Sequence, residues 1–458
     1  MKEAKAMSSN YINEYMLRLK DLMRDQYTFK PTEHDDPNIK RGLRNADGTG
    51  VLLGITKIGS VQGYTIQDGE RMPAPGRLYY RGISVEDIVE SHRKNKTFGF
   101  SEVVFLLLVG KLPTASQLKE FETMMAEARQ LPKSFVEDMI LRAPSPDIMN
   151  KLARCVLALY SYDDRPDDLS PENLMRQSIE LVARFPSIVA NAFAAKRHYY
   201  DHDSLFIHNT NPELSVAEDF LRMMRKDNAF TIEEARLLDL MLMIHAEHGG
   251  GNNSTYVCRA MSSSRTDTYS AIAGAVGSLK GPLHGGANAK VMQMFRDIQE
   301  HVRDYTDEDE LTAYLAKILR GSANDGSGKI YGLGHAVYTI SDPRCELLKK
   351  YSRAVAERSG HLDEFELMLR IEKCGIPLIT KMKNLDMPIC ANVDMYSGLI
   401  YEFLGIPQAL FTPLFAIARV SGWCANRMEE VLTCNRIHRP AYRAEKLRVP
   451  YVEMQDRV

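Results

Sequence analysis

The chain has 458 residues, of which 44% are hydrophobic and 26% are charged, so it can bury a large core as one large domain or two coupled ones. Its formal net charge of -2, with acids and bases interspersed, excludes a long-range attraction to nucleic acid or to an anionic membrane. An anionic ligand would have to be held by local cationic groups.

Cysteine usage and the apolar segments bear on location. The seven cysteines include no CxxC pair and leave one unpaired, which argues against a disulfide scaffold or a zinc ribbon and favours a reducing compartment. The start of the chain lacks an apolar core and resembles neither a secretory signal nor a transit peptide. The longest apolar stretches, such as 103–110, are too short for a bilayer, which needs about 20 residues. We expect a cytoplasmic protein that binds neither nucleic acid nor membrane.

The N-terminal part of the chain predicts one helix and then a hairpin. Residues 9–27 place aromatic and aliphatic side chains among charges at helical spacing, which indicates an amphipathic helix. Residues 28–50 are rich in Pro, Asp, Asn and Gly. Residues 50–82 then alternate apolar with Gly and polar residues, as short hairpin strands do.

From Ile83 onward the pattern predicts helix after helix, several of which open with the residues typical of helix N-termini, as at Thr114, Ser215 and Thr231. The sequence therefore predicts a mainly α fold with a short N-terminal β-hairpin region. Gly-rich segments interrupt the helices, and catalytic loops commonly lie in such places. These segments are at 249–251, 281–286, 321–334 and 398.

His284 lies in GSLKGPLHGGANAKVMQMF, just before a helix expected to begin near Ala287. The positive helix end would disfavour an imidazolium. A neutral ring is a hydrogen-bond donor suited to a carbonyl oxygen that becomes an enolate, provided its other nitrogen accepts a hydrogen bond. The alternative is a histidine that merely caps the helix.

His335 follows Gly332 and Gly334, whose missing side chains would let a ligand approach the backbone. The segment lacks both G-x-G-x-x-G and the Walker lysine, so it is weak as a nucleotide motif. Arg344, in SDPR, offers a bidentate fork for a carboxylate, the alternative being a surface salt bridge.

Asp394, in NVDMYSG, sits among apolar neighbours ahead of an expected helix. Partial desolvation would raise its basicity, as a general base requires, and the alternative is an N-cap. Arg419 lies in the apolar stretch FAIARVSGW and needs an anionic partner. Arg439 precedes a proline in an extended segment. With Arg344, these arginines would suit a dicarboxylate.

His245 and His248 are three residues apart at an expected helix end and would face one site. The sequence HAEH is not HExxH, and no carboxylate or cysteine follows at zinc-like spacing. A structural His245 beside a ligand-binding His248 is favoured over a metal site.

The chain resembles the citrate synthase family in five motifs that occur in the family's order: GPLHGGAN, GLGHAVYTISDPR, NVDMYSG, FAIARVSGW and RPAYR. The stretches RLYYRGISVEDIVE, FSEVVFLLLVGKLPT and PELSVAEDFLRMM look like further family features. The resemblance covers roughly residues 50 to 445 and leaves the N-terminal residues and the insert-like SYDDRPDDLSPEN unexplained.

The resemblance implies a multi-helical fold with a large and a small helical domain. An N-terminal helix and linker would occupy 1–50. The large domain would comprise 51–285 and 400–458, the latter with a C-terminal arm, and the small domain 286–399. It also implies an acyltransferase of the Si type, in the tricarboxylic acid cycle, that condenses acetyl-CoA with oxaloacetate and hydrolyses citryl-CoA.

The same resemblance implies the roles of the site residues. Asp394 would remove a proton from the acyl methyl group, His284 would hydrogen-bond the enolate oxygen, and His335 would polarise the ketone and protonate the alkoxide. The oxaloacetate carboxylates would be clamped by His248, Arg344, Arg419 and Arg439, the last from the other subunit of a homodimer. The loop that receives CoA would be Lys329, Ile330, Tyr331, Gly332, Leu333 and Gly334. No metal or cofactor is implied.

Two departures from the family pattern stand out. Ala391 replaces the usual proline before NVD, and HAEHGGGNNST has one glycine more than the commoner HADHxxNAST, which would shift the contact of His248 with a carboxylate.

Three other functions are compatible with parts of the sequence. The nearest is 2-methylcitrate synthase, which uses propionyl-CoA. One methylene is worth only about 1–3 kcal/mol, and we identify no residue that separates the two. A helical CoA- or anion-binding scaffold without catalysis would lack at least one proton-transfer residue, and all three are present. A metallohydrolase using His245 and His248 is the third.

Overall fold

A computed structural model describes Met16, residues 19–20, 38–45, 48–68, 70–444 and 449–457. The helix expected over 9–27 lies almost wholly outside the described residues. The chain forms two compact units, Met1–Ile55 and Thr56–Val458. The first contains a 3-10 turn at Arg41–Leu43 and a bridge between Arg44 and Gly50.

The predicted hairpin is confirmed as part of a small antiparallel sheet. Its strands are β1 (Gly59–Gln67), β2 (Glu70–Tyr80) and β3 (Ile83–Ser84), in that order. Gly59 lies opposite Tyr80, and a bulge falls between Gln62 and Tyr64. The sequence predicts that the hairpin region begins at Gly50, whereas the first strand begins at Gly59. Residues 51–58 pair with no described strand, so they form no ladder.

The rest of the second unit is helical, as predicted. The first ten long helices are α2 (Val85–Asn95), α3 (Phe100–Val109), α4 (Ala115–Ala128), α5 (Ile148–Leu159), α6 (Pro171–Tyr200), α7 (Val216–Met224), α8 (Ile232–His245), α9 (Asn253–Ser263), α10 (Thr268–Lys280) and α11 (Ala287–His301). They are followed by α12 (Glu308–Leu319), α13 (Pro343–Ser359), α14 (Leu362–Lys383), α15 (Asp394–Phe403) and α16 (Phe411–Thr433). Short turns lie at Val136–Leu141, Tyr160–Tyr162, Gln408–Leu410 and Met454–Asp456.

Local sequence explains where many helices begin. Thr114, Ser215 and Thr231 each form a capping box with the residue three positions on. The sequence predicts an α-helix over residues 134–143, but Val136–Leu141 forms a π-helical turn instead. The buried Lys151 ammonium donates to the carbonyls of Met139 and Ala143 there, so a side chain satisfies carbonyls that an α-helix would pair internally.

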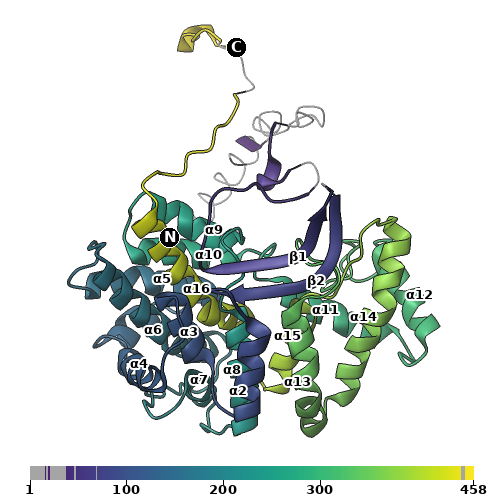
Figure 1. Cartoon of the computed structure of the whole chain (residues 1–458), viewed down its shortest axis with the longest axis horizontal. Helices are drawn as coiled ribbons and strands as arrows, with labels where there is room; N and C mark the ends of the chain where they lie inside the picture. The colour runs from purple at the N-terminus through teal and green to yellow at the C-terminus, as the bar shows by residue number, and fades with distance from the viewer. Residues whose placement is uncertain are drawn as a thin grey trace, which may run out of the picture. The chain divides into compact units, whose positions relative to one another are not determined.

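Packing around α16 places the core of this unit. This helix is buried along most of its length and contacts α3, α6, α8, α9 and α10, with Trp423 fully buried. The helices α11 to α15 pack on one another, and Figure 1 shows them together in the green part of the chain. α13 joins the two groups through α2, α8 and β2. The domain boundaries at 285/286 and 399/400 stay a prediction.

Among the helices of the described residues, none is both long enough and apolar enough to cross a membrane.

Candidate active site

His284 lies in the turn between α10 and α11, with one ring nitrogen already occupied. Its Nε2 accepts the backbone N–H of Ser254 at 3.3 Å and lies 2.9 Å from the Ser254 hydroxyl. An occupied acceptor leaves the ring proton on Nδ1. Burial, and then the charge of Arg419, lower the pKa of His284 to about 4. The ring is therefore a neutral donor, as predicted, although burial rather than the helix end is the main cause.

His335 has the complementary arrangement. The backbone N–H groups of Val337 and Tyr338 both donate to its Nδ1, at 3.0 Å each. Because Nδ1 accepts, the proton of the neutral ring sits on Nε2. The ring stacks on Tyr338 with centroids 4.5 Å apart. The two histidines thus use opposite nitrogens as donors, and the backbone fixes each choice.

Asp394 is the first residue of α15, and the N-cap interpretation is wrong. Val393 occupies the cap position, and the Asn392 side chain accepts the Asp394 N–H at 3.0 Å. The Asp394 carboxylate thus has no capping role. Burial raises its pKa to about 6, against the lowering effect of Arg344 and Arg419. A carboxylate of this basicity suits proton abstraction near neutral pH.

Arg344 is buried at the start of α13, which overturns the surface salt bridge interpretation, since only 4% of it is exposed. Its Nε and Nη2 donate to the two oxygens of Asp342 at 3.0 and 2.7 Å. Burial alone would lower the pKa of Arg344, and the Asp342 carboxylate reverses this and raises it. Asp342 also accepts the Val393 N–H at 3.1 Å, so it joins the start of α13 to the loop before Asp394.

Arg419 is fully buried on α16, and two of its nitrogens lack partners. Its Nε donates to the His245 carbonyl at 2.7 Å, whereas Nη1 and Nη2 find no acceptor among the described residues. Burial lowers the pKa of Arg419 to about 10, and the nearby Glu247 carboxylate opposes this. Two unpaired charged donors in the interior favour an anionic ligand with two oxygens.

His245 and His248 differ in their surroundings, and ligand binding by His248 stays a prediction. His245, the last residue of α8, is buried and donates from Nδ1 to the Met241 carbonyl at 2.7 Å, which makes it structural. His248 lies beyond the helix, with Nε2 3.2 Å from the Tyr338 hydroxyl and its ring 5.4 Å from that of His335. Burial, and then the charge of Arg344, lower the pKa of His248. In the described part of the chain, no three potential ligands gather around a metal position.

Electrostatic coupling shows which of these groups share one site. The charge of Arg419 acts on His248, His284 and Asp394. The charge of Arg344 acts on His248 and Asp394. With His335 in ring contact with His248, the structure brings together six of the predicted residues: His248, His284, His335, Arg344, Asp394 and Arg419.

The seventh residue of the predicted acid–base and carboxylate set, Arg439, is not brought to this group within one chain. It lies exposed on the segment that follows α16.

The predicted CoA loop lies beside the site and pairs with the loop before Asp394. Ile330 is buried, and the Tyr331 hydroxyl donates to Asp325 at 2.7 Å. Leu333 forms an antiparallel bridge with Ala391, the position of the missing proline, while Lys329 is exposed. A Cβ on Gly332 would lie 2.9 Å from the Met395 Cα, so this glycine is explained by close packing on α15.

Three positioning residues escaped sequence reasoning: Ser254, Asp342 and Asn392. Two of them carry a local signal, since Asp342 and Asn392 each lie two residues before a predicted site residue and bond its backbone N–H. Ser254 carries none, because it meets His284 only through the packing of α9 against the turn after α10.

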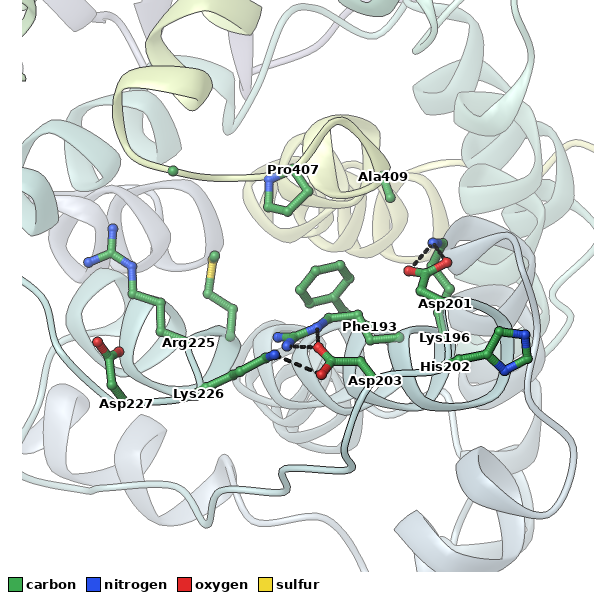
Figure 2. A pocket seen from close by; sticks show the side chains of 13 residues that line it. Phe193, Lys196, Asp201, His202, Asp203, Arg225, Lys226, Asp227, Pro407 and Ala409 are labelled. Atoms are coloured by element: carbon green, nitrogen blue, oxygen red, sulfur yellow. Dashed lines mark hydrogen bonds and ion pairs between the residues drawn. The ribbon is translucent and has the colours of Figure 1, made fainter. Parts of the chain in front are cut away.

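A separate cavity of about 770 Å³ lies at the C-terminal ends of α6 and α7, lined also by Gly405 and Pro407. It contains none of the predicted site residues. Its cations are paired, and Figure 2 shows Lys196 against Asp201 and Lys226 turned toward Asp203, at 2.7 Å in each pair. The lysines that line this cavity are therefore already paired with carboxylates.

Comparisons with known proteins agree with this geometry. Residues 47–441 match the family described as citrate synthase, C-terminal domain. The chain is 34% identical to a citrate synthase of Deinococcus radiodurans over 92% of this chain and 99% of the relative. It is 31% identical to a 2-methylcitrate synthase of Shewanella oneidensis over 80% and 87%.

Solved structures are similar over the same length. The citrate synthase of Thermotoga maritima has 31% identity and a TM-score of 0.71, covering 92% of this chain and 99% of that one. That of Thermoplasma acidophilum, solved as a ternary complex with carboxymethyl coenzyme A and oxaloacetate, has 25% identity and a TM-score of 0.74, covering 92% of this chain and 100% of that one.

Proposed function

Because the chain belongs to the citrate synthase family, we propose that it condenses acetyl-CoA with oxaloacetate and hydrolyses the citryl-CoA intermediate to citrate and CoA. The observation that carries the proposal is the arrangement of His284 and His335. Backbone N–H groups donate to Nε2 of His284 and to Nδ1 of His335, so the proton of each neutral ring lies on the opposite nitrogen, and we assign each of these ring N–H groups to a substrate oxygen. Asp394, with its raised pKa, supplies the base.

The reaction follows from these proton positions. Asp394 takes a proton from the methyl group of acetyl-CoA, while Nδ1–H of His284 donates to the thioester oxygen and stabilises the enol or enolate. The new carbon–carbon bond forms at the ketone of oxaloacetate, whose oxygen receives the Nε2–H of His335. Water then cleaves the thioester, and CoA leaves as the thiol. Positioned acid–base groups of this kind each contribute about 10²–10⁴-fold.

Oxaloacetate binding is assigned to the buried cations. Nη1 and Nη2 of Arg419, which have no partner among the described residues, suit one carboxylate. The charge of Arg419 acts on His248, and the charge of Arg344 acts on Arg419. Arg439 completes the set from the other subunit of a homodimer, since it is exposed on the segment that follows α16. The Thermoplasma relative, solved with oxaloacetate and a CoA analogue, supports both substrates. We place CoA at Lys329–Gly334 and the enzyme in the cytoplasm.

The alternative substrate is propionyl-CoA, because the chain is also similar to the 2-methylcitrate synthase of Shewanella oneidensis. Thiol release measured with acetyl-CoA and with propionyl-CoA, each with oxaloacetate, separates the two. We expect a higher kcat/KM with acetyl-CoA. A clear preference for propionyl-CoA would reassign the enzyme within the family, and no thiol release with either would refute the proposal. Activity is expected to persist in a chelator, since no metal takes part.

A further inference from the structure

The segment that follows α16 is anchored at His438. Among residues 434–444, His438 is half-buried, whereas the neighbouring Ile437 is 61% exposed. Arg439 is exposed and directly follows His438, so its backbone begins where His438 is held.

Three contacts hold His438. Its backbone N–H donates to the Ser263 hydroxyl at 3.0 Å. Its ring stacks on Tyr256, with centroids 6.1 Å apart and planes within 16°. Its Nε2 lies 3.2 Å from Oε1 of Glu430. The backbone, the face and the edge of this residue are each fixed, to α9 and to α16.

The partner carboxylate explains why His438 stays docked. Glu430 is 3% exposed, and its Oε2 accepts from Arg259 at 3.0 Å. Its Oε1 has no hydrogen-bond partner among the described residues, and the His438 Nε2 lies 3.2 Å from it. A buried carboxylate oxygen without a partner is costly, which favours the docked imidazole.

The ion pair between Arg259 and Glu430 is linked to the candidate active site. Arg259 donates from Nε to Oδ1 of Asn426 at 2.8 Å, and Asn426 donates to Oε2 of Glu247 at 3.0 Å. Glu247 directly precedes His248. A continuous buried polar chain thus runs from the anchor of the C-terminal segment to the loop that carries a predicted carboxylate ligand.

We propose that His438 is a positioning residue for Arg439. By docking against Glu430, Tyr256 and Ser263, it fixes the point from which the arginine reaches a substrate carboxylate, so that the arginine is preorganised before substrate binds. The inference rests on the proposed function, in which Arg439 binds oxaloacetate.

The kinetic test compares His438→Ala with Ile437→Ala, its exposed neighbour. If His438→Ala leaves Arg439 correctly placed in about a tenth of molecules, KM for oxaloacetate rises about tenfold. The kcat and the KM for acetyl-CoA stay within about twofold of the parent, and Ile437→Ala resembles the parent in all three constants. In an Arg439→Ala background, His438→Ala should add nothing, because the two residues act on one contact. The proposal would be overturned if the effects of His438→Ala and Arg439→Ala on KM were fully additive. It would also be overturned if His438→Ala and Ile437→Ala had the same KM for oxaloacetate.

A measurement without substrate separates this inference from the proposed function. The His438 amide is bonded to Ser263, so its hydrogen exchange should speed up in both Ser263→Ala and His438→Ala and stay unchanged in Ile437→Ala. If Arg439→Ala alone left KM unchanged, the assignment of Arg439 to oxaloacetate would fail and positioning with it, while faster exchange would still establish the anchor. Unchanged exchange would refute the anchor itself.

Discussion

The side-chain amide of Asn392 donates to the carbonyl oxygen of Gly334 at 2.9 Å. Its side-chain oxygen accepts the N–H of Asp394, and its backbone N–H donates to the Gly332 carbonyl at 2.9 Å. Asn392 therefore joins the loop of His335 to the start of the helix that carries Asp394, next to the bridge between Leu333 and Ala391.

Replacing Asn392 should disturb both loops at once. We expect Asn392→Ala to lower kcat about 10²-fold, since a shift of about 1 Å in reacting groups has that effect. The free energy of unfolding should fall by about 1–3 kcal/mol because two hydrogen bonds are lost. Steady-state kinetics and thermal unfolding measure these, with Asn209→Ala on an exposed side chain as control. Parent-like kcat would contradict the linking role.

The pKa of Asp394 gives opposite predictions for activity and stability. Burial raises it from 3.8 to about 6, so the folded state binds more protons than the unfolded state between these values, and stability falls as pH rises through that window. Asp394→Asn should therefore unfold at a higher temperature than the parent at pH 8, by about 1–3 kcal/mol in free energy, with a smaller difference at pH 5.

The same variant should lose at least about 10³-fold in kcat, because no base remains. In the parent, kcat/KM for acetyl-CoA should fall below about pH 6 as the carboxylate is protonated. Scanning calorimetry at the two pH values and thiol-release assays test both halves. An Asn variant that turned over normally would remove Asp394 from the mechanism.

Local chemistry explains why so much of the fold could be predicted. The capping box of Thr231 involves residues three positions apart, and the periodicity of α8 lies within the same stretch, so both are visible in sequence. The π-helical turn at Val136–Leu141 was not, because its carbonyls are satisfied by Lys151 from the following helix. Such partners depend on tertiary packing.

The site divides in the same way. Aspartate favours the N-cap position, which makes an N-cap the alternative for Asp394 in the sequence, but Asn392 bonds the relevant N–H. The sequence offers Arg344 as a candidate carboxylate ligand, which stays a prediction, and its burial results from packing of α13 against α8 and β2. Residue type and order identify the chemical groups, whereas burial and pKa arise only from contacts between distant segments.

Catalysis should tolerate loss of the Ser254 hydroxyl better than loss of the His284 ring. His284→Ala removes the enolate donor and should lower kcat about 10²–10³-fold. Ser254→Ala keeps the backbone N–H that occupies Nε2 and should cost less than about tenfold. With the pKa of His284 near 4, no limb from this residue should appear in the kcat profile above pH 5. Equal losses in both variants would show that the hydroxyl, not the amide, sets the tautomer.

Two buried arginines on α16 allow binding and stability to be separated. Two nitrogens of Arg419 have no partner among the described residues, whereas all three nitrogens of Arg427 donate, to Thr268, Ser262 and Thr266. Arg419→Lys keeps the charge near Glu247 but loses the fork, so the affinity for oxaloacetate should fall about 10- to 100-fold while the unfolding temperature without ligand changes little.

Arg427→Lys should do the reverse, since it breaks a satisfied network away from the substrate. We expect a loss of about 1–3 kcal/mol in the free energy of unfolding and an unchanged Kd for oxaloacetate. Titration calorimetry and thermal unfolding of the two variants, made side by side, decide the matter. Should Arg419→Lys bind oxaloacetate as tightly as the parent, its unpaired nitrogens would not be the carboxylate site, because a lysine ammonium cannot reproduce two parallel bonds from one planar group.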